Sequence, residues 1–296
     1  NNKYTMSLSL NVLNHLGINL YSNIPAVLSE IVANSWDADA ETVKIFFNNG
    51  EIIIVDDGCG MDEDDINQKF LTVGYPKRES GNVISPKFER RYMGRKGIGK
   101  LSMFSVAKEI EVISRKDGIL NAFRMNVDNI VTVIKEKEKD GDYHPEVLTV
   151  ENSALKHDGT KIILKKLKRN ITSLTPEYIR KRIARRFSII GSKNHFEVFV
   201  NDKKVSIADR DYFHKLNYIW YYGEESSEYA NYANKAVHKE ERNNILKYNG
   251  IPYIISGWIG TVESSGDLKD GEDNINKIVI LVRGKLGQED ILDEYT

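Results

Sequence analysis

The chain of 296 residues lacks the features of a secreted or membrane-bound protein. Its single cysteine, Cys59, excludes an internal disulfide framework and a zinc site built from several cysteines, and it is typical of a reducing cytosol. No apolar run approaches the ~20 residues that span a bilayer, and the polar start at Asn1 is no signal peptide. We therefore expect a cytoplasmic protein with no membrane partner. The chain starts without a methionine and ends directly after a periodic stretch, as an excised fragment would.

An excess of charge of either sign is also missing. The 42 Lys and Arg residues balance 43 Asp and Glu residues, and the net charge of -1 excludes the global positive field of a dedicated nucleic-acid-binding protein. A local basic patch stays possible. Both DNA and a protein are therefore compatible with the sequence as clients. The hydrophobic share of 41% is enough for a sizeable core, and the length favours two domains.

Helix and strand patterns alternate over the first half of the chain. Apolar residues from Ile24 to Ile31 recur every three or four positions, which predicts an amphipathic helix over 24–36. Apolar runs on both sides of the turn pair Asn49-Gly50 predict a hairpin, which a short helix over 62–71 follows. Further along we expect a helix over 97–107 and strands near 110–114, 120–126, 130–134, 146–151 and 159–166.

Two interruptions of this pattern organise the chain. Residues 72–100 show little periodicity and many Gly, Pro, Lys, Arg and Ser residues, so we expect a long functional loop or lid. The pattern loosens again after Lys168, which predicts a first domain over 1–168 and a second over 169–296. In the second domain we expect a basic helix over 176–187, a hairpin over 196–205, a loop or insertion over 224–238 and strands over 253–262 and 277–282.

The first predicted helix carries polar side chains along one side. Glu30, Asn34 and Asp37 are spaced by four and three residues, which places them beside one another at the edge of the apolar face. An amide oxygen there suits a hard cation such as Mg²⁺, and a carboxylate suits the activation of a water molecule. Taken alone, such a pattern more often marks a solvated stripe on an ordinary helix.

A second motif, Asp56-Asp57-Gly58-Cys59-Gly60-Met61, follows a strongly apolar strand. Its alternate glycines let the backbone turn sharply and approach a flat ligand, and a carboxylate at the strand end can accept a hydrogen bond from an exocyclic amino group. A simple turn after a strand is the alternative for this motif alone.

The third motif closes the long loop with glycines and lysines. Amide groups of such a turn, with the positive end of a helix behind them, form a cradle for phosphate. The spacing is neither that of the common P-loop nor that of a dinucleotide fingerprint. The cradle residues are Gly94, Lys96, Gly97, Ile98, Gly99 and Lys100. A fourth element, Asp158-Gly159-Thr160, opens a strand and offers a hydroxyl group to a polar network.

Together, and in this order, the four elements resemble the GHKL ATPase superfamily of DNA gyrase B, heat-shock chaperones, histidine kinases and MutL. The resemblance covers about residues 6–166 and implies ATP as ligand, Mg²⁺ as cofactor and the α+β sandwich called the Bergerat fold, a mixed, mainly antiparallel sheet under helices. The sequence Asn34-Ser35-Trp36-Asp37-Ala38 most resembles that of the MORC, MutL and chaperone branch. In that branch a smaller α/β transducer domain follows.

This resemblance also implies roles for individual residues. Glu30 is the general base for the attacking water, Asn34 the magnesium ligand and Asp56 the adenine reader, which Thr160 supports through water. Lys285, after the last predicted strand, is the candidate for the lysine that transducer domains send to the terminal phosphate, and an ordinary Gly-Lys turn is the alternative. The other residues implied in nucleotide binding are Asp37, Gly58, Gly60, Met61, Gly94, Lys96, Gly97, Ile98, Gly99 and Lys100.

The expected function is slow, Mg²⁺-dependent hydrolysis of ATP to ADP. By the resemblance, ATP binding closes the lid and drives the homodimerisation of a clamp or switch, and hydrolysis resets it. Glu30 favours hydrolysis, because histidine kinases usually lack this residue. Two alternatives stay open: a nucleotide-gated binding module with little hydrolysis, and a kinase-like phosphoryl donor.

Overall fold

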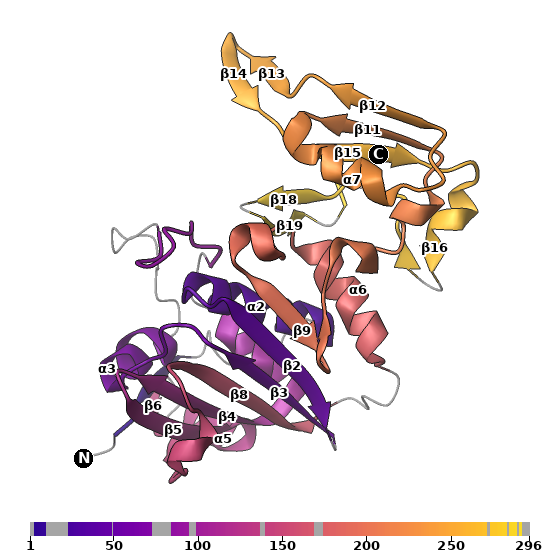
Figure 1. The fold of residues 1–296 in the computed structure, drawn as a ribbon. Helices are drawn as coiled ribbons and strands as arrows, with labels where there is room; N and C mark the ends of the chain where they lie inside the picture. Colours follow the sequence, from indigo (N-terminus) through magenta and orange to yellow (C-terminus); the bar gives the residue numbers. More distant parts are fainter. Residues whose placement is uncertain are drawn as a thin grey trace. The chain divides into compact units, whose positions relative to one another are not determined.

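The computed structural model of the chain divides into two compact units. One consists of Asn1–Val205 and Val282–Lys285, and the other of Ser206–Leu281 and Leu286–Thr296 (Figure 1). The structure describes residues 3–9, 23–48, 50–72, 84–94, 99–136, 140–168, 174–270, 273–282, 284–288 and 290–291. Helix α6 and strand β9 follow the predicted domain boundary at residue 168 but belong to the first unit, because β9 pairs with β2. The boundary and the transducer-like second domain stay predictions.

An eight-stranded sheet forms the framework of the first unit. Its strand order is β10-β9-β2-β3-β8-β4-β5-β7, in which β2 and β9 are parallel and all other neighbours antiparallel. The strands are β2 (Thr42–Asn48), β3 (Glu51–Asp56), β4 (Ala107–Lys116), β5 (Ile119–Asn126), β7 (Glu146–Val147), β8 (Gly159–Leu167), β9 (Glu197–Val200) and β10 (Lys203–Lys204). This mixed, mainly antiparallel sheet with its helices confirms the predicted α+β class.

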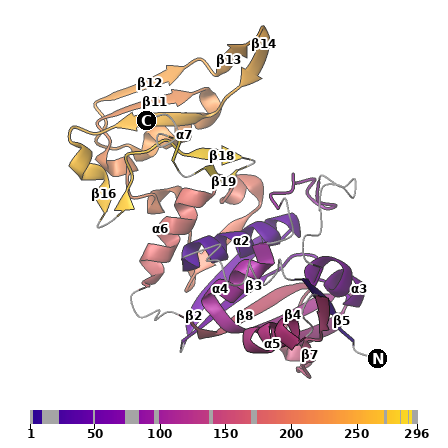
Figure 2. The same cartoon turned by 180° about the vertical axis from the view of Figure 1, so that it is seen from behind.

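Four helices among the described residues share one hydrophobic core with this sheet. They are α2 (Ile24–Asp37), α4 (Met103–Val106), α5 (Val127–Glu136) and α6 (Pro176–Arg186). Figure 2 shows α2 and α4 against the face of the sheet. Helix α2 begins where the Asn23 side chain accepts a hydrogen bond from the Ala26 amide at 2.9 Å, with Pro25 in its first turn. The buried face of α2 includes Val27, Leu28 and Ile31, as the apolar spacing predicts.

Shorter elements complete the first unit. Strand β1 (Met6–Ser9) pairs with β6 (Asp140–Tyr143), and α3 (Glu63–Asp65) continues into a π-helical turn (Ile66–Phe70) where a short helix is predicted. Turns of 3-10 helix lie at Gly99–Ser102, Asn152–Ala154 and Ser192–Asn194. The helix expected over 97–107 is confirmed only over Gly99–Val106, because Ala107 already begins β4 and residues 97–98 lie outside the described part.

The strand predicted near 130–134 is wrong, because these residues lie in helix α5. Its β-branched composition favours a strand. However, Val127 and Ile130 are both buried, and a spacing of three residues brings them to one face of a helix. Tertiary burial outweighs the local preference for extended backbone here.

The second unit is built on a three-stranded sheet in the order β12-β11-β15. Its strands are β11 (Tyr218–Tyr222), β12 (His238–Arg242) and β15 (Gly257–Thr261), and its core includes Phe213, Leu216 and Ile219. Helix α7 (Ser227–Tyr232) lies in the segment predicted to be a loop, so that prediction is wrong there. Its two-stranded sheets are β13 (Ile245–Tyr248) with β14 (Ile251–Ile254) and β16 (Lys269–Asp270) with β17 (Asp273–Asn274). Strands β18 (Ile280–Val282) and β19 (Lys285–Gln288) form a further pair, of which Val282 and Lys285 belong to the first unit.

Four further turns of 3-10 helix belong to the second unit, at Ile207–Asp209, Phe213–Lys215, Glu224–Ser226 and Ser265–Leu268. Among the residues that the structure describes in both units, no helix is long and apolar enough to cross a membrane.

Candidate functional site

Helix α2 presents the first group of predicted site residues. The Glu30 side chain is 20% exposed, and its Oε1 atom accepts a hydrogen bond from Lys285 Nζ at 2.8 Å. Asn34 follows one turn later and is exposed. The structure therefore brings Lys285 to Glu30 across 255 residues of sequence. Lys285 itself is only 16% exposed, so this ion pair is partly shielded from water.

The turn that carries Lys285 is held by the segment after α6. The Ser188 amide donates to the Gly284 carbonyl oxygen at 2.8 Å, and Phe187 and Lys285 form an isolated antiparallel bridge. Gly284 has a φ of +80°, and a Cβ atom there would lie 2.2 Å from the Ile189 side chain. Glycine is required at this position by both its conformation and its close packing. The Gly-Lys pair is thus fixed in place.

Asp56 ends strand β3 inside the molecule. Its Oδ1 atom accepts hydrogen bonds from the amides of Gly58 at 3.0 Å and Thr160 at 3.2 Å, and its Oδ2 atom accepts one from Ser35 Oγ at 2.9 Å. Burial raises the pKa of Asp56 to about 6, because removal from water disfavours the carboxylate, although these hydrogen bonds oppose the shift. The carboxylate is therefore mostly ionised at pH 7, yet it lies in surroundings poor in water.

The register of the sheet explains how Thr160 reaches Asp56. Thr160 on β8 lies opposite Asp56 on β3 and opposite Ser114 on β4. The Ser114 hydroxyl group lies 3.1 Å from Thr160 Oγ1, donates to the Gly159 carbonyl oxygen at 3.0 Å and accepts from the Met61 amide at 2.9 Å. The second and fourth sequence motifs are thus joined by direct hydrogen bonds.

The glycines of these motifs are needed by the chain's own packing. A Cβ atom on Gly60, whose φ is +66°, would lie 1.8 Å from the Arg115 carbonyl oxygen. On Gly159 it would lie 2.1 Å from the carbonyl oxygen of Asp56, and on Gly58 2.7 Å from that of Ala38. The missing side chains therefore let three segments meet around Asp56.

Asp37 is directed to the backbone of the long loop. Its carboxylate accepts hydrogen bonds from the amides of Met93 at 2.8 Å and Gly94 at 3.1 Å. The Gly94 amide, which the motif assigns to the phosphate cradle, is thus bonded to Asp37 in this structure. Of the remaining cradle, only the backbone of Gly99 and Lys100 is described. Lys96, Gly97 and Ile98 lie outside the described residues.

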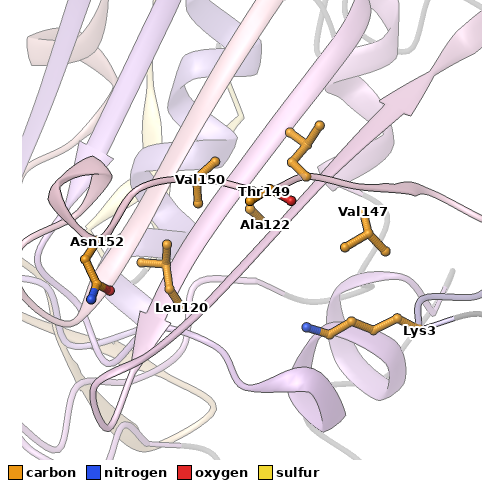
Figure 3. A pocket seen from close by; sticks show the side chains of 8 residues that line it. Lys3, Leu120, Ala122, Val147, Thr149, Val150 and Asn152 are labelled. Carbon is orange, nitrogen blue, oxygen red and sulfur yellow. The ribbon is translucent and has the colours of Figure 1, made fainter.

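A hollow of about 440 Å³ lies elsewhere on the first unit. Figure 3 shows Lys3 and Val147 of β7 at one side of it and Leu120 of β5 at the other. None of the predicted site residues that the structure describes lines this hollow. It is separate from the set of side chains that the motifs bring together.

Sequence reasoning missed Ser35 and Ser114, the two hydroxyl groups bound to the site's polar atoms. Both are at most 2% exposed. Ser35 stands on the apolar face of α2, and Ser114 stands in the long apolar strand β4. A polar residue inside a buried apolar pattern needs a hydrogen-bond partner, and that is the signal that could have identified them.

Comparisons with known proteins agree with this arrangement. A family model described as "Histidine kinase-, DNA gyrase B-, and HSP90-like ATPase" matches residues 21–156. The chain is 40% identical to "Putative type II restriction enzyme HgiDII" of Herpetosiphon aurantiacus, over 99% of this chain and 46% of the relative.

Chaperones of the HtpG type are also similar over a shorter stretch. HtpG of Rickettsia canadensis is 32% identical over 36% of this chain and 21% of the chaperone, and HtpG of Rickettsia prowazekii is 30% identical over the same shares. The chain thus spans less than half the length of these relatives. The matched family model covers the elements that carry Glu30, Asn34 and Asp56, and its domain implies ATP binding. Over residues 21–156 the chain thus carries a GHKL-type domain of the histidine kinase-, gyrase B- and HSP90-like ATPases.

Proposed function

We propose that this protein hydrolyses ATP to ADP and phosphate at the site formed by α2, the end of β3 and the Lys285 turn. The observation that carries the proposal is the ion pair between Glu30 and Lys285 at 2.8 Å. It places the Glu30 carboxylate, which can accept a proton, beside the Lys285 ammonium group, which can stabilise the negative charge of a phosphate group. Glu30 also lies one helical turn from Asn34.

The adenine base binds at Asp56. The ionised carboxylate accepts a hydrogen bond from the exocyclic amino group, while the amide of Gly58 and the hydroxyl group of Ser35 hold the carboxylate in place. The bonds of Thr160 with Asp56 and Ser114 hold the strand ends around the base in one arrangement. The Thr160 amide supports Asp56 directly, and the support through water that the sequence implies stays a prediction.

Asn34 is the protein ligand for Mg²⁺. Within the described residues, no group of three or more His, Cys, Asp or Glu side chains could hold a metal ion by itself. An exposed amide oxygen on α2 instead suits an ion that takes its other ligands from phosphates and water. When bound, Mg²⁺ neutralises charge on the phosphate oxygens.

Glu30 acts as the general base in this proposal. Its carboxylate orients a water molecule for in-line attack on the terminal phosphorus and accepts the proton of that water. Lys285 Nζ, which contacts Glu30, stabilises the charge that develops on the terminal phosphate. Amides of the cradle over Gly97–Lys100 bind the same phosphate groups.

Nucleotide binding is proposed to act as a switch. If the loop becomes ordered around the terminal phosphate, ATP binds to the closed conformation only. ATP binding then favours closure of the predicted lid over 72–100 and formation of a homodimer. Hydrolysis then resets the state. The HgiDII relative is named a putative type II restriction enzyme, so DNA is the first client to test, with a protein client as the alternative.

Phosphate release from ATP, measured with and without Mg²⁺, tests this function. We expect Mg²⁺-dependent release of phosphate with no labelling of the protein when the terminal phosphate carries the label. Stable ATP occupancy without release would instead identify a nucleotide-gated binding module. Transfer of the label to a histidine of a partner would identify a phosphoryl donor.

A further inference from the structure

Arg90 is a buried cation that none of the nucleotide-binding motifs includes. It is 5% exposed, and its guanidinium group lies over the rings of Trp36 at 4.3 Å and Phe88 at 4.5 Å, with Phe196 at 5.4 Å. Such stacking on aromatic faces stabilises a desolvated guanidinium group. Three segments that are distant in sequence supply these rings.

Arg90 belongs to residues 84–94, which we call the lid base because they lead into the glycine-rich motif. Its own amide donates to Ser85 Oγ at 2.9 Å, and the Ser85 amide donates to its carbonyl oxygen at 2.8 Å. Asp39 accepts hydrogen bonds from Ser85 Oγ and from the amides of Lys87 and Phe88. The lid base is therefore anchored at the end of α2.

The guanidinium group connects the lid base to residues 187–196, which we call the support segment. It donates to the carbonyl oxygens of His195 at 2.7 Å and Asn194 at 3.4 Å, and to that of Ala40 at 2.6 Å. The Asn194 side chain in turn donates to the Ile189 carbonyl oxygen at 2.8 Å. Arg90 thus binds one end of a segment that is braced internally.

The other end of the support segment holds the turn of Lys285. Ser188 donates to the Gly284 carbonyl oxygen, Phe187 bridges to Lys285, and Ile189 packs against Gly284. The contacts run without a gap from Arg90 through the support segment to Lys285 and from there to Glu30.

We propose that Arg90 is a positioning residue for the reaction, which sets the place of Lys285 relative to Glu30 through the support segment. The lid base and the Lys285 turn are then held by the same segment. A displacement of the phosphate-binding loop therefore also displaces Lys285 relative to Glu30. This inference rests on the proposed function, because Lys285 has a catalytic task only if ATP is hydrolysed here.

Arg90→Lys is the variant that tests the role of the guanidinium group. Lysine keeps the charge but cannot stack a planar group between two rings or bond several carbonyl oxygens at fixed angles. His195→Ala is the matched control, because the exposed His195 ring stacks on Phe88 at 6.0 Å, whereas its bond with Arg90 uses the backbone. If Arg90→Lys does not fold, Phe88→Leu removes one ring of the same cluster with less disturbance.

A double-mutant cycle with Lys285→Ala provides the functional readout. We expect Arg90→Lys to lower the turnover of ATP about tenfold with Lys285 present, but less than about twofold in the Lys285→Ala background, because residues that act through one another are not additive. The affinity for adenosine should stay unchanged and His195→Ala should match wild type. Equal losses of turnover in both backgrounds would show that Arg90 acts only through the general stability of the fold, and would overturn the inference.

Amide hydrogen exchange tests the same connection without hydrolysis. Arg90→Lys should accelerate exchange in both the lid base and the support segment, and leave the pair of β4 and β5 unchanged. Unchanged exchange in the support segment would overturn the inference even if the protein is an active ATPase. Absence of phosphate release by the wild type would refute the proposed function and with it the catalytic task of Lys285, whereas the exchange result would still test the connection from Arg90 to the support segment.

Discussion

Replacing Asp56 by asparagine separates nucleotide binding from folding. Burial raises the pKa of this carboxyl group from 3.8 to about 6 in the folded protein. A group with a raised folded pKa binds its proton more strongly when folded, so its contribution to stability is present below pH ~3.8 and is lost as the pH rises through about 6. At about 1.4 kcal/mol for each pKa unit, the ionised carboxylate costs about 3 kcal/mol at pH 7.

The D56N substitution would avoid this cost and keep the local bonds. The new amide oxygen can accept from Gly58 and Thr160, and the amide nitrogen can donate to Ser35 Oγ, which lies 3.2 Å from the Ile31 carbonyl oxygen. We therefore expect nucleotide-free D56N to be more stable than wild type at pH 7, by up to about 3 kcal/mol. The difference should shrink toward zero near pH ~4. ADP or ATP should no longer stabilise the variant, because the adenine amino group meets a donor.

Chemical denaturation at about pH 4.5 and pH 7, with and without nucleotide, measures both effects. Asp57→Asn is the control, because Asp57 is exposed at the same strand end and its Oδ1 atom accepts from the amides of Glu41 and Thr42, which asparagine can also do. The control should keep its nucleotide response. Retained stabilisation of D56N by nucleotide would show that the adenine pocket is misassigned. A stability difference independent of pH would refute the burial argument.

Two further predictions concern the same region. Gly60→Ala should destabilise the fold by about 3 kcal/mol or more, because its Cβ atom would lie 1.8 Å from the Arg115 carbonyl oxygen. Gly118 has a similar φ of +78°, but a Cβ atom there would meet no atom within 4 Å. Gly118→Ala should therefore cost only about 1 kcal/mol, and urea titration of both variants measures the difference. Calorimetric ATP affinity should be constant only well above pH 6, where Asp56 is ionised, and should fall as Asp56 takes up its proton through about pH 6 and below. An unchanged wild-type affinity at about pH 5 would contradict the carboxylate's role.

The sequence could predict those parts of the fold that local patterns determine. The spacing of apolar residues predicts α2, and paired apolar runs predict the hairpin of β2 and β3. It fails for α5, where β-branched residues form a helix because Val127 and Ile130 are buried together. The motifs predict Glu30, Asp56 and Thr160 as parts of one site because they occur together in one order, and the structure joins Thr160 to Asp56.

The remaining contacts of the site depend on pairing between distant segments. The apolar strand around Ser114 indicates that its hydroxyl group needs a partner, but which groups become its partners follows from the register of β4 and β8. Arg90 occurs in a loop without periodicity, and only the fold brings it to the carbonyl oxygens of the support segment. The sequence alone is enough to predict Lys285 as a candidate site residue. Its contact with Glu30 is a property of the folded chain.

The central claim is that Glu30 activates water for ATP hydrolysis, and Glu30→Gln tests it most directly. Glutamine keeps the size of the side chain and can accept a hydrogen bond from Lys285, but it cannot take a proton from water. Calorimetric ATP binding and phosphate release should be measured together, beside Asn34→Ala, which should lose Mg²⁺-dependent binding and turnover in parallel. For Glu30→Gln we expect ATP affinity within a few-fold of wild type and turnover lowered by about 10²–10⁴. Hydrolysis by Glu30→Gln at the wild-type rate would contradict the account.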